Sequence, residues 1–145
     1  MEIYTIGFTK KSAGEFFGTL KRAGVRRLID IRLNNTSHLA GFTKQADLPF
    51  FLKELCGIEY VHAPLLAPTQ DILDSFKKRK GSWKEYERDF INLMIERRIE
   101  EKLKPDFFAG PAVLLCSEPT AEHCHRRLVL EYLGNKWGHM DMVHL

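Results

Sequence analysis

The segment from position 116 to position 127, CSEPTAEHCHRR, brings thiols, imidazoles, carboxylates and guanidinium groups together in one short stretch. Thiols and imidazoles are the side chains that proteins use for nucleophilic catalysis and proton transfer, and together with carboxylates they also bind zinc. The residue types therefore allow three interpretations. The segment is a metal site, a catalytic thiol with its helper groups, or an ordinary polar turn between a strand and a helix.

The position of Cys124 favours a catalytic thiol. A helix predicted over residues 121–133, with Thr120 as its N-cap, puts Cys124 in the first turn, where the helix dipole and free backbone amides stabilise a thiolate. At 100° per residue, His125 falls near the centre of the inward face of this helix. We therefore predict that Cys124 acts as a nucleophile or as a thiol acid or base, with His125 or Glu118 transferring protons.

Metal binding is the alternative use of the same side chains. Their C-x-E-x5-C-H spacing is not one of the common zinc patterns, and the adjacent Cys124 and His125 point about 100° apart on a helix. We therefore assign no residue to a metal, although a metal-binding protein stays an alternative. Four residues of the segment are chemically plausible zinc ligands: Cys116, Glu118, Cys124 and His125.

Strands and helices are predicted to alternate along the whole chain and to position these side chains. Capping boxes at Ser12-x-x-Glu15 and Ser82-x-x-Glu85 mark helix starts, and Gly24 is a natural helix stop. This alternation is typical of a three-layer αβα fold with a largely parallel sheet, Rossmann-like or flavodoxin-like, in a single domain over residues 1–145. We expect strands at 1–7, 26–32, 58–62, 112–116 and 137–144, and helices at 13–23, 46–55, 71–80, 83–103 and 121–133.

Polar residues follow several of the predicted strands. In open α/β sheets, ligands bind beyond the carboxyl ends of the strands, so we expect one active site there that binds a small anionic or nucleotide-like ligand. Arg32 and Arg126 would hold the anion, with Asp30 orienting Arg32; the alternative is a structural Asp30–Arg32 ion pair. The predicted catalytic residues are Asp30, Glu118, Cys124 and His125, and the predicted ligand-binding residues include Thr5, Gly7, Arg32, Cys116 and Arg126.

A basic run predicts a second class of partner. Residues 77–80, KKRK, carry four positive charges close to Trp83, an arrangement that could follow the phosphates of a nucleic acid. The alternative is a solvated helix end, since charge runs usually lie in water. The net charge of +3 is too small to decide between them. The nucleotide-binding motifs GxxxxGK[ST] and GxGxxG and the serine-hydrolase motif GxSxG are absent, so the sequence indicates no cofactor.

Cysteine usage and hydropathy bear on the cellular compartment. The chain has three cysteines, an odd number, and shows neither a signal peptide nor an apolar run long enough to span a membrane. We therefore expect a cytoplasmic protein without a membrane partner, in which Cys/His clusters are catalytic, metal-binding or buried. The oligomeric state cannot be predicted from these features.

The motifs also resemble a known family, the bacterial and archaeal proteins called Domain of Unknown Function 488. The likeness extends over nearly the whole chain and is most distinctive at the C-x-E…C-H-R ending. It implies an α/β fold and one shared site that includes Asp30, Arg32 and the residues of this ending, with Ser37 as a further binding residue, but it implies no reaction. The matching motifs are TIG at 5–7, Asp30-x-Arg32 with Ser37, Phe42, Tyr60, Cys116-x-Glu118 and Cys124-His125-Arg126.

Overall fold

A computed structural model describes residues 2–34, 41–117, 124–138 and 140–145. It contains a five-stranded sheet in the order β3-β2-β4-β1-β5. All of its strand pairs are parallel, which confirms the predicted α/β fold with a parallel sheet. The strands are β1 (Glu2–Gly7), β2 (Arg27–Asp30), β3 (Glu59–His62), β4 (Ala112–Cys116) and β5 (Asp141–His144).

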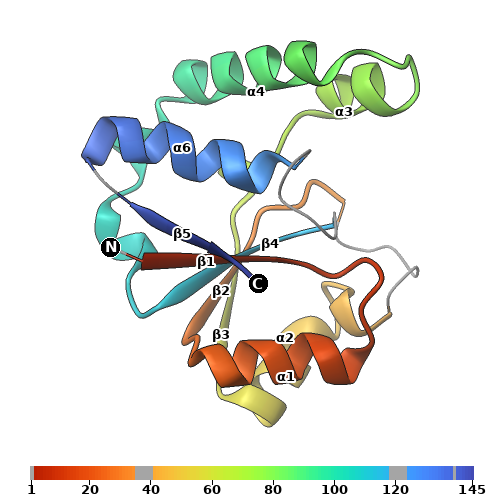
Figure 1. Cartoon of the computed structure of the whole chain (residues 1–145), viewed down its shortest axis with the longest axis vertical. Coiled ribbons are helices and arrows are strands. Elements are labelled where there is room, and N and C mark those ends of the chain that lie inside the picture. The colour runs from red at the N-terminus through yellow and green to blue at the C-terminus, as the bar shows by residue number, and fades with distance from the viewer. Residues whose placement is uncertain (1, 35–40, 118–123, 139) are drawn as a thin grey trace.

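Helices cover both faces of the sheet and give the predicted three layers (Figure 1). One face is covered by α1 (Ala13–Ala23), α2 (Leu48–Phe51) and the π-helical turn Leu52–Cys56 that continues α2. The opposite face is covered by α4 (Trp83–Arg97), α5 (Ile99–Lys102) and α6 (His125–Trp137), and α3 (Gln70–Lys77) packs against α4. Three short 3-10 helices lie at Gly41–Thr43, Pro64–Leu66 and Pro105–Phe108.

The alternation of side chains along the strands divides the core between the two faces. On β2, Leu28 packs toward α1 and Ile29 packs toward α4 and α6. On β4, Leu115 faces α1, whereas Leu114 and Cys116 face α4 and α6. Because successive strand residues point to opposite faces, the polar residues at the strand ends are divided in the same way.

Both predicted capping boxes start helices. The hydroxyl groups of Ser12 and Ser82 accept hydrogen bonds from the backbone N–H groups three residues ahead, at Glu15 and Glu85. Gly24 ends α1 in the left-handed conformation, with φ of 72°, which a residue without Cβ adopts easily. These local signals account for the bounds of α1 and for the start of α4.

The helix expected over 46–55 is α2 with its π-helical turn, the one expected over 71–80 ends at Lys77, and two further helices differ more from the prediction. The helix expected over 83–103 ends at Arg97, because Arg98 adopts a left-handed φ of 51° before α5 begins. The last helix was expected to start near residue 121 and to stop at Gly134; it starts at His125 and runs through Gly134 to Trp137. Among the described residues, none of the helices combines the length and the apolar character needed to cross a membrane.

Candidate functional site

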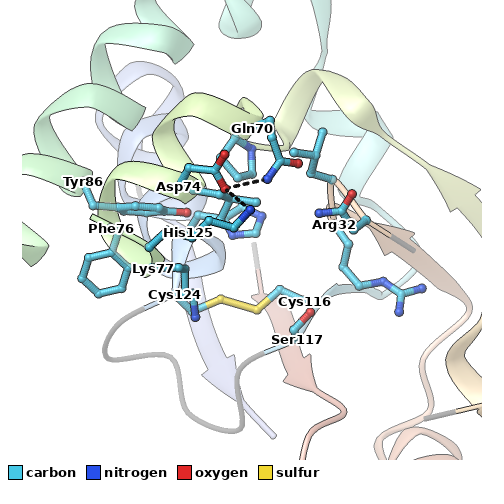
Figure 2. A pocket seen from close by; sticks show the side chains of 15 residues that line it. Arg32, Gln70, Asp74, Phe76, Lys77, Tyr86, Cys116, Ser117, Cys124 and His125 are labelled. Carbon is cyan, nitrogen blue, oxygen red and sulfur yellow. Dashed lines mark hydrogen bonds and ion pairs between the residues drawn. A yellow bond between two sulfur atoms is a disulfide. The ribbon is translucent and has the colours of Figure 1, made fainter. Parts of the chain in front are cut away.

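A cavity of about 280 Å³ lies at the carboxyl edge of the sheet, on the face covered by α4 and α6 (Figure 2). It lies where the connection after β2 leaves toward α2 and the connection after β4 leaves toward α6, which is the usual place for a ligand in an open α/β sheet. Five segments line it: Arg32–Asn34 after β2, Pro68 with residues of α3, Tyr86 of α4, Cys116 and Ser117 after β4, and Cys124 and His125 at α6.

The wall of this cavity includes a cluster of two sulfurs and an imidazole, here called the cysteine cluster: Cys116, Cys124 and His125. Cys116 is the last residue of β4, and Cys124 immediately precedes α6. A disulfide joins the two cysteines, whose Cα atoms are 7.5 Å apart. One ligand atom from each of the three residues lies within 4.8 Å of the others. The cluster is enclosed by the fold, since the three residues are 1%, 3% and 8% exposed in chain order.

His125 is held in a defined orientation. Its Nε2 donates a hydrogen bond to the Ile31 carbonyl, with 2.7 Å between nitrogen and oxygen, since a backbone carbonyl only accepts. Its ring packs edge-on against Phe90 of α4, with 5.3 Å between the ring centroids. A neutral ring bonded in this way carries its lone pair on Nδ1.

Arg126 supplies positive charge behind the sulfurs. Its side chain is fully buried, and its Nη1 donates to the Cys116 sulfur at 3.6 Å. Its charge also extends toward the end of β1: burial lowers the pKa of Lys11, and the Arg126 charge lowers that pKa further. A buried guanidinium beside a reduced cysteine favours the thiolate over the thiol.

A second polar cluster, here called the Asp30 network, lies on the other face of the sheet. Arg32 donates from Nε and Nη2 to the two carboxylate oxygens of Asp30, at 2.8 Å each, and from Nη2 to the Thr43 carbonyl at 2.6 Å. Tyr60 donates to the same carboxylate at 2.6 Å, and the guanidinium stacks on the Phe8 ring. The predicted alternative of an Asp30–Arg32 ion pair is therefore present in the structure.

The Asp30 side chain and the Arg32 guanidinium point away from the cysteine cluster. Asp30 follows Ile29 on β2 and so points to the α1 face, whereas Cys116 points to the α6 face. Arg32 contributes to the cavity wall, but its guanidinium points away from the two cysteines (Figure 2). Of the two residues, Arg32 lines the same cavity as the cysteines, whereas Asp30 does not line it.

The other predicted site residues have different surroundings. The Thr5 hydroxyl forms a hydrogen bond with Nδ1 of His144 on β5, and Gly7 lies beside Cys116 in the sheet; neither lines the cavity. Cys124 has extended backbone angles at the N-cap position of α6, one residue before the first helical turn that we predicted for it. The predicted residues Ser37 and Glu118 lie outside the described residues.

Helix α3 contributes a wall that the sequence analysis missed. Leu73 and Phe76 provide apolar surface to the cavity, and Lys77 and Lys78 line it with positive charge. The basic run, interpreted above only as a nucleic-acid contact or a solvated helix end, therefore also borders the cavity. The available signal was the long connection between β3 and β4, which is far longer than one crossover helix requires.

The fold and the site together define an α/β protein with a cysteine–histidine cluster beside a cavity at the strand ends. A family model described as "Domain of unknown function DUF488" matches residues 12–133, and the chain belongs to this family. The matched residues include the cysteine cluster and α3. Comparison with curated proteins found no match, and neither did comparison with solved structures.

Proposed function

We propose that the protein is a thiol-based enzyme whose cavity binds a small, negatively charged ligand. The observation that carries this proposal is the meeting of both sulfurs, the His125 imidazole and the cavity at one place, next to the start of α6. A volume of about 280 Å³ is slightly below the range of about 300–1,000 Å³ that holds drug-sized ligands, so it suits a small molecule.

Positive groups around the cavity support a negatively charged ligand. Lys77 and Lys78 line one wall, and the N-terminal residue of α6, His125, lines the same cavity, so the positive end of the helix dipole lies beside it. The one carboxylate in the cavity wall, that of Asp74, accepts a hydrogen bond from Gln70 and lies 3.6 Å from Lys78. Arg32 has no such role in this proposal, because Asp30 already neutralises its charge.

The closeness of the two sulfurs supports a two-electron reaction of the reduced pair. The Cys124 thiolate attacks an electrophilic sulfur or oxygen of the ligand and displaces the first leaving group, which takes up one proton. The Cys116 thiol then attacks Cys124 and releases the rest of the ligand with a second proton, which forms the disulfide. The ligand gains two electrons, and a small-molecule or protein thiol must reduce the disulfide before the next turnover.

Cys124 is the better nucleophile of the pair, because it is the residue next to the helix N-terminus, where the helix dipole stabilises a thiolate. His125 follows it directly and is placed to transfer the protons, while Arg126 lies against Cys116. Cys116 acts as the second thiol, since its sulfur is the one already bonded to Cys124.

A trapping experiment tests this assignment. A reduced, metal-free C56S/C116S protein that keeps only Cys124 is treated with a panel of small anionic disulfides and hydroperoxides, and the adducts are identified by mass spectrometry. We expect rapid adduct formation on Cys124, because no second thiol remains to release it. The matched C56S/C124S protein should react much more slowly at Cys116. Equal rates for the two proteins, or no adduct with any anion, would contradict the proposal.

Nucleic-acid binding is not proposed as the function. Two of the basic residues are engaged with acidic residues of α3, since Lys78 lies 3.6 Å from Asp74 and Arg79 lies 3.2 Å from Asp71. Trp83 stacks on Tyr86, with ring centroids 4.9 Å apart, and so uses one ring face inside the protein. The aromatic and basic groups therefore do not form the open stacking surface that binds single strands.

A further inference from the structure

The cysteine cluster also has the composition of a metal site. We propose that, in the reduced protein, Cys116, Cys124 and His125 bind a zinc ion as three protein ligands. Two thiolates and one imidazole are a donor set that zinc prefers, whereas magnesium and calcium require oxygen ligands. Among the described residues, these three form the group of potential ligands whose atoms converge within 4.8 Å.

The surroundings of His125 are those of a metal-bound histidine. Such histidines almost always donate the second ring N–H to a carboxylate or a carbonyl, which fixes the tautomer and the orientation of the ring. His125 makes this hydrogen bond from Nε2 to the Ile31 carbonyl at 2.7 Å. The lone pair of the neutral ring is then on Nδ1, which is the metal-binding atom in this proposal.

The backbone holds the two cysteines at a separation that suits a metal ion. Zn–S bonds of about 2.3 Å in a tetrahedral site place two sulfurs about 3.8 Å apart. The Cα atoms of Cys116 and Cys124, at 7.5 Å, can accommodate this separation by side-chain rotation, without movement of β4 or α6. Metal binding first requires an external thiol to supply two electrons and two protons to the disulfide, and zinc then displaces both thiol protons.

Among the described residues, no fourth ligand atom joins these three, which leaves one coordination position for the site. All three proposed ligands line the cavity (Figure 2), so a fourth ligand would be a water molecule or a negatively charged atom of a bound molecule. Three protein ligands with an open fourth position are typical of catalytic zinc sites, whereas structural zinc sites are closed by four protein ligands. The proposed site is therefore one at which zinc meets the ligand of the cavity.

This inference goes beyond the proposed thiol reaction, because the same two sulfurs either bind the metal or form the disulfide. The reduced, metal-bound form and the oxidised form exclude each other. Zinc would withdraw Cys124 from the thiol reaction until the metal is removed, so metal and oxidant would compete for one pair of cysteines.

Cobalt titration of the reduced protein tests the site. Co²⁺ occupies zinc sites, and thiolate ligands give it intense near-ultraviolet and visible absorption. We expect one Co²⁺ per reduced wild-type chain, displaceable by Zn²⁺, and no binding to the oxidised protein. This comparison uses the wild-type chain alone, so it does not depend on how any variant folds.

Variants then assign the ligands. C116S and C124S should lose the thiolate absorption, and H125Q should weaken binding by at least about 100-fold, beyond most losses of outer hydrogen bonds around a metal site. C56S is the matched control, because Cys56 lies on the other face and its sulfur donates to the Phe17 carbonyl. It should bind cobalt like the wild type.

Two results would overturn the metal site: no cobalt binding by the reduced wild-type protein, or equal binding by C116S, C124S and the wild type. Either result leaves the thiol proposal to its own test, because the trapping experiment uses metal-free protein. Failure of that trapping experiment together with stoichiometric cobalt binding would reject the thiol reaction and keep the metal site.

Discussion

Two polar clusters lie at the same edge of the sheet, on opposite faces, and their polar atoms are used differently. In the Asp30 network, both carboxylate oxygens accept hydrogen bonds from Arg32, and Tyr60 adds another. In the cysteine cluster, the sulfurs and the imidazole line a cavity. The first arrangement uses its polar groups for contacts within the protein, and the second has its sulfurs and imidazole in the wall of a cavity.

This difference shows that convergence at strand ends is not enough to define an active site. Asp30 and Cys116 both lie at carboxyl ends of neighbouring strands, yet the sheet lies between their side chains. The Asp30 network is expected to act on stability and the cysteine cluster on reactivity. The predictions below separate these two effects.

The largest expected effect is on the Asp30 network. D30A leaves the buried Arg32 guanidinium without its carboxylate, and loss of one partner of a buried pair lowers the free energy of unfolding by about 3–5 kcal/mol. Urea unfolding measures the change. E59Q is the control, since it breaks the exposed Arg27–Glu59 pair between β2 and β3, which contributes less than about 1 kcal/mol. Similar losses in both variants would contradict a special role for the network.

A smaller loss of stability is expected for Y60F. This change removes one hydrogen bond to a buried carboxylate but keeps the ring and the Asp30–Arg32 pair, so we expect a loss of about 1.5–3 kcal/mol. Urea unfolding of Y60F beside D30A orders the two contributions. A loss as large as that of D30A would mean that Tyr60, rather than the ion pair, holds the network together.

On the other face of the sheet, R126M is expected to slow the alkylation of the reduced cysteines. Removal of the buried positive charge beside Cys116 disfavours the thiolate form, so we expect alkylation at pH 7 to slow by about tenfold. Alkylation of the reduced protein followed by peptide mass spectrometry measures this. R127M is the control, because Arg127 pairs with Glu131 at 2.7 Å and with Glu87. Equal alkylation rates in both variants would contradict a role of Arg126 in thiolate stabilisation.

The smallest expected effect concerns His144 at the edge strand. Burial lowers the pKa of His144, and the charges of Arg126 and Arg127 lower it further. The unfolded chain therefore takes up this proton more readily than the folded protein, so stability is lost as the pH falls from about 7 through the ordinary histidine value near 6.5 and below. Thermal unfolding at pH 8 and pH 5.5 should show a smaller decrease for H144Q than for the wild type. An identical decrease in both proteins would mean that other titrating groups cause the pH dependence of stability.

Much of the fold could be predicted because its signals are local. Ser12 and Gly24 mark the ends of α1 through capping chemistry that needs no tertiary contact. Arg98 and Gly134 show where local signals fail. Arg98 adopts a left-handed conformation without being a glycine, and Gly134, expected to stop α6, lies inside the helix, which ends instead at Trp137, before Gly138 with φ of 101°.

The site was predicted only in part, because its division between two faces depends on strand order. The positions of Cys124 and His125 next to a helix start followed from helical periodicity, with the start displaced by a few residues. The position of Arg32 relative to the cysteines could not be predicted from the sequence. It depends on β2 lying beside β4 and on which helices cover each face of the sheet. The cavity wall from α3 likewise depends on a long connection whose path no local pattern specifies.

The central claim is that the cysteine cluster is the reactive centre of the protein. Its most direct test is the alkylation rate of each cysteine in the reduced, metal-free wild-type protein at pH 7, measured by peptide mass spectrometry. Burial raises the pKa of Cys56, whereas Cys124 lies at a helix N-terminus beside the cavity. The account predicts that Cys124 reacts at least about tenfold faster than Cys56, as one pKa unit would produce. A Cys56 that reacts as fast as Cys124, or faster, would contradict it.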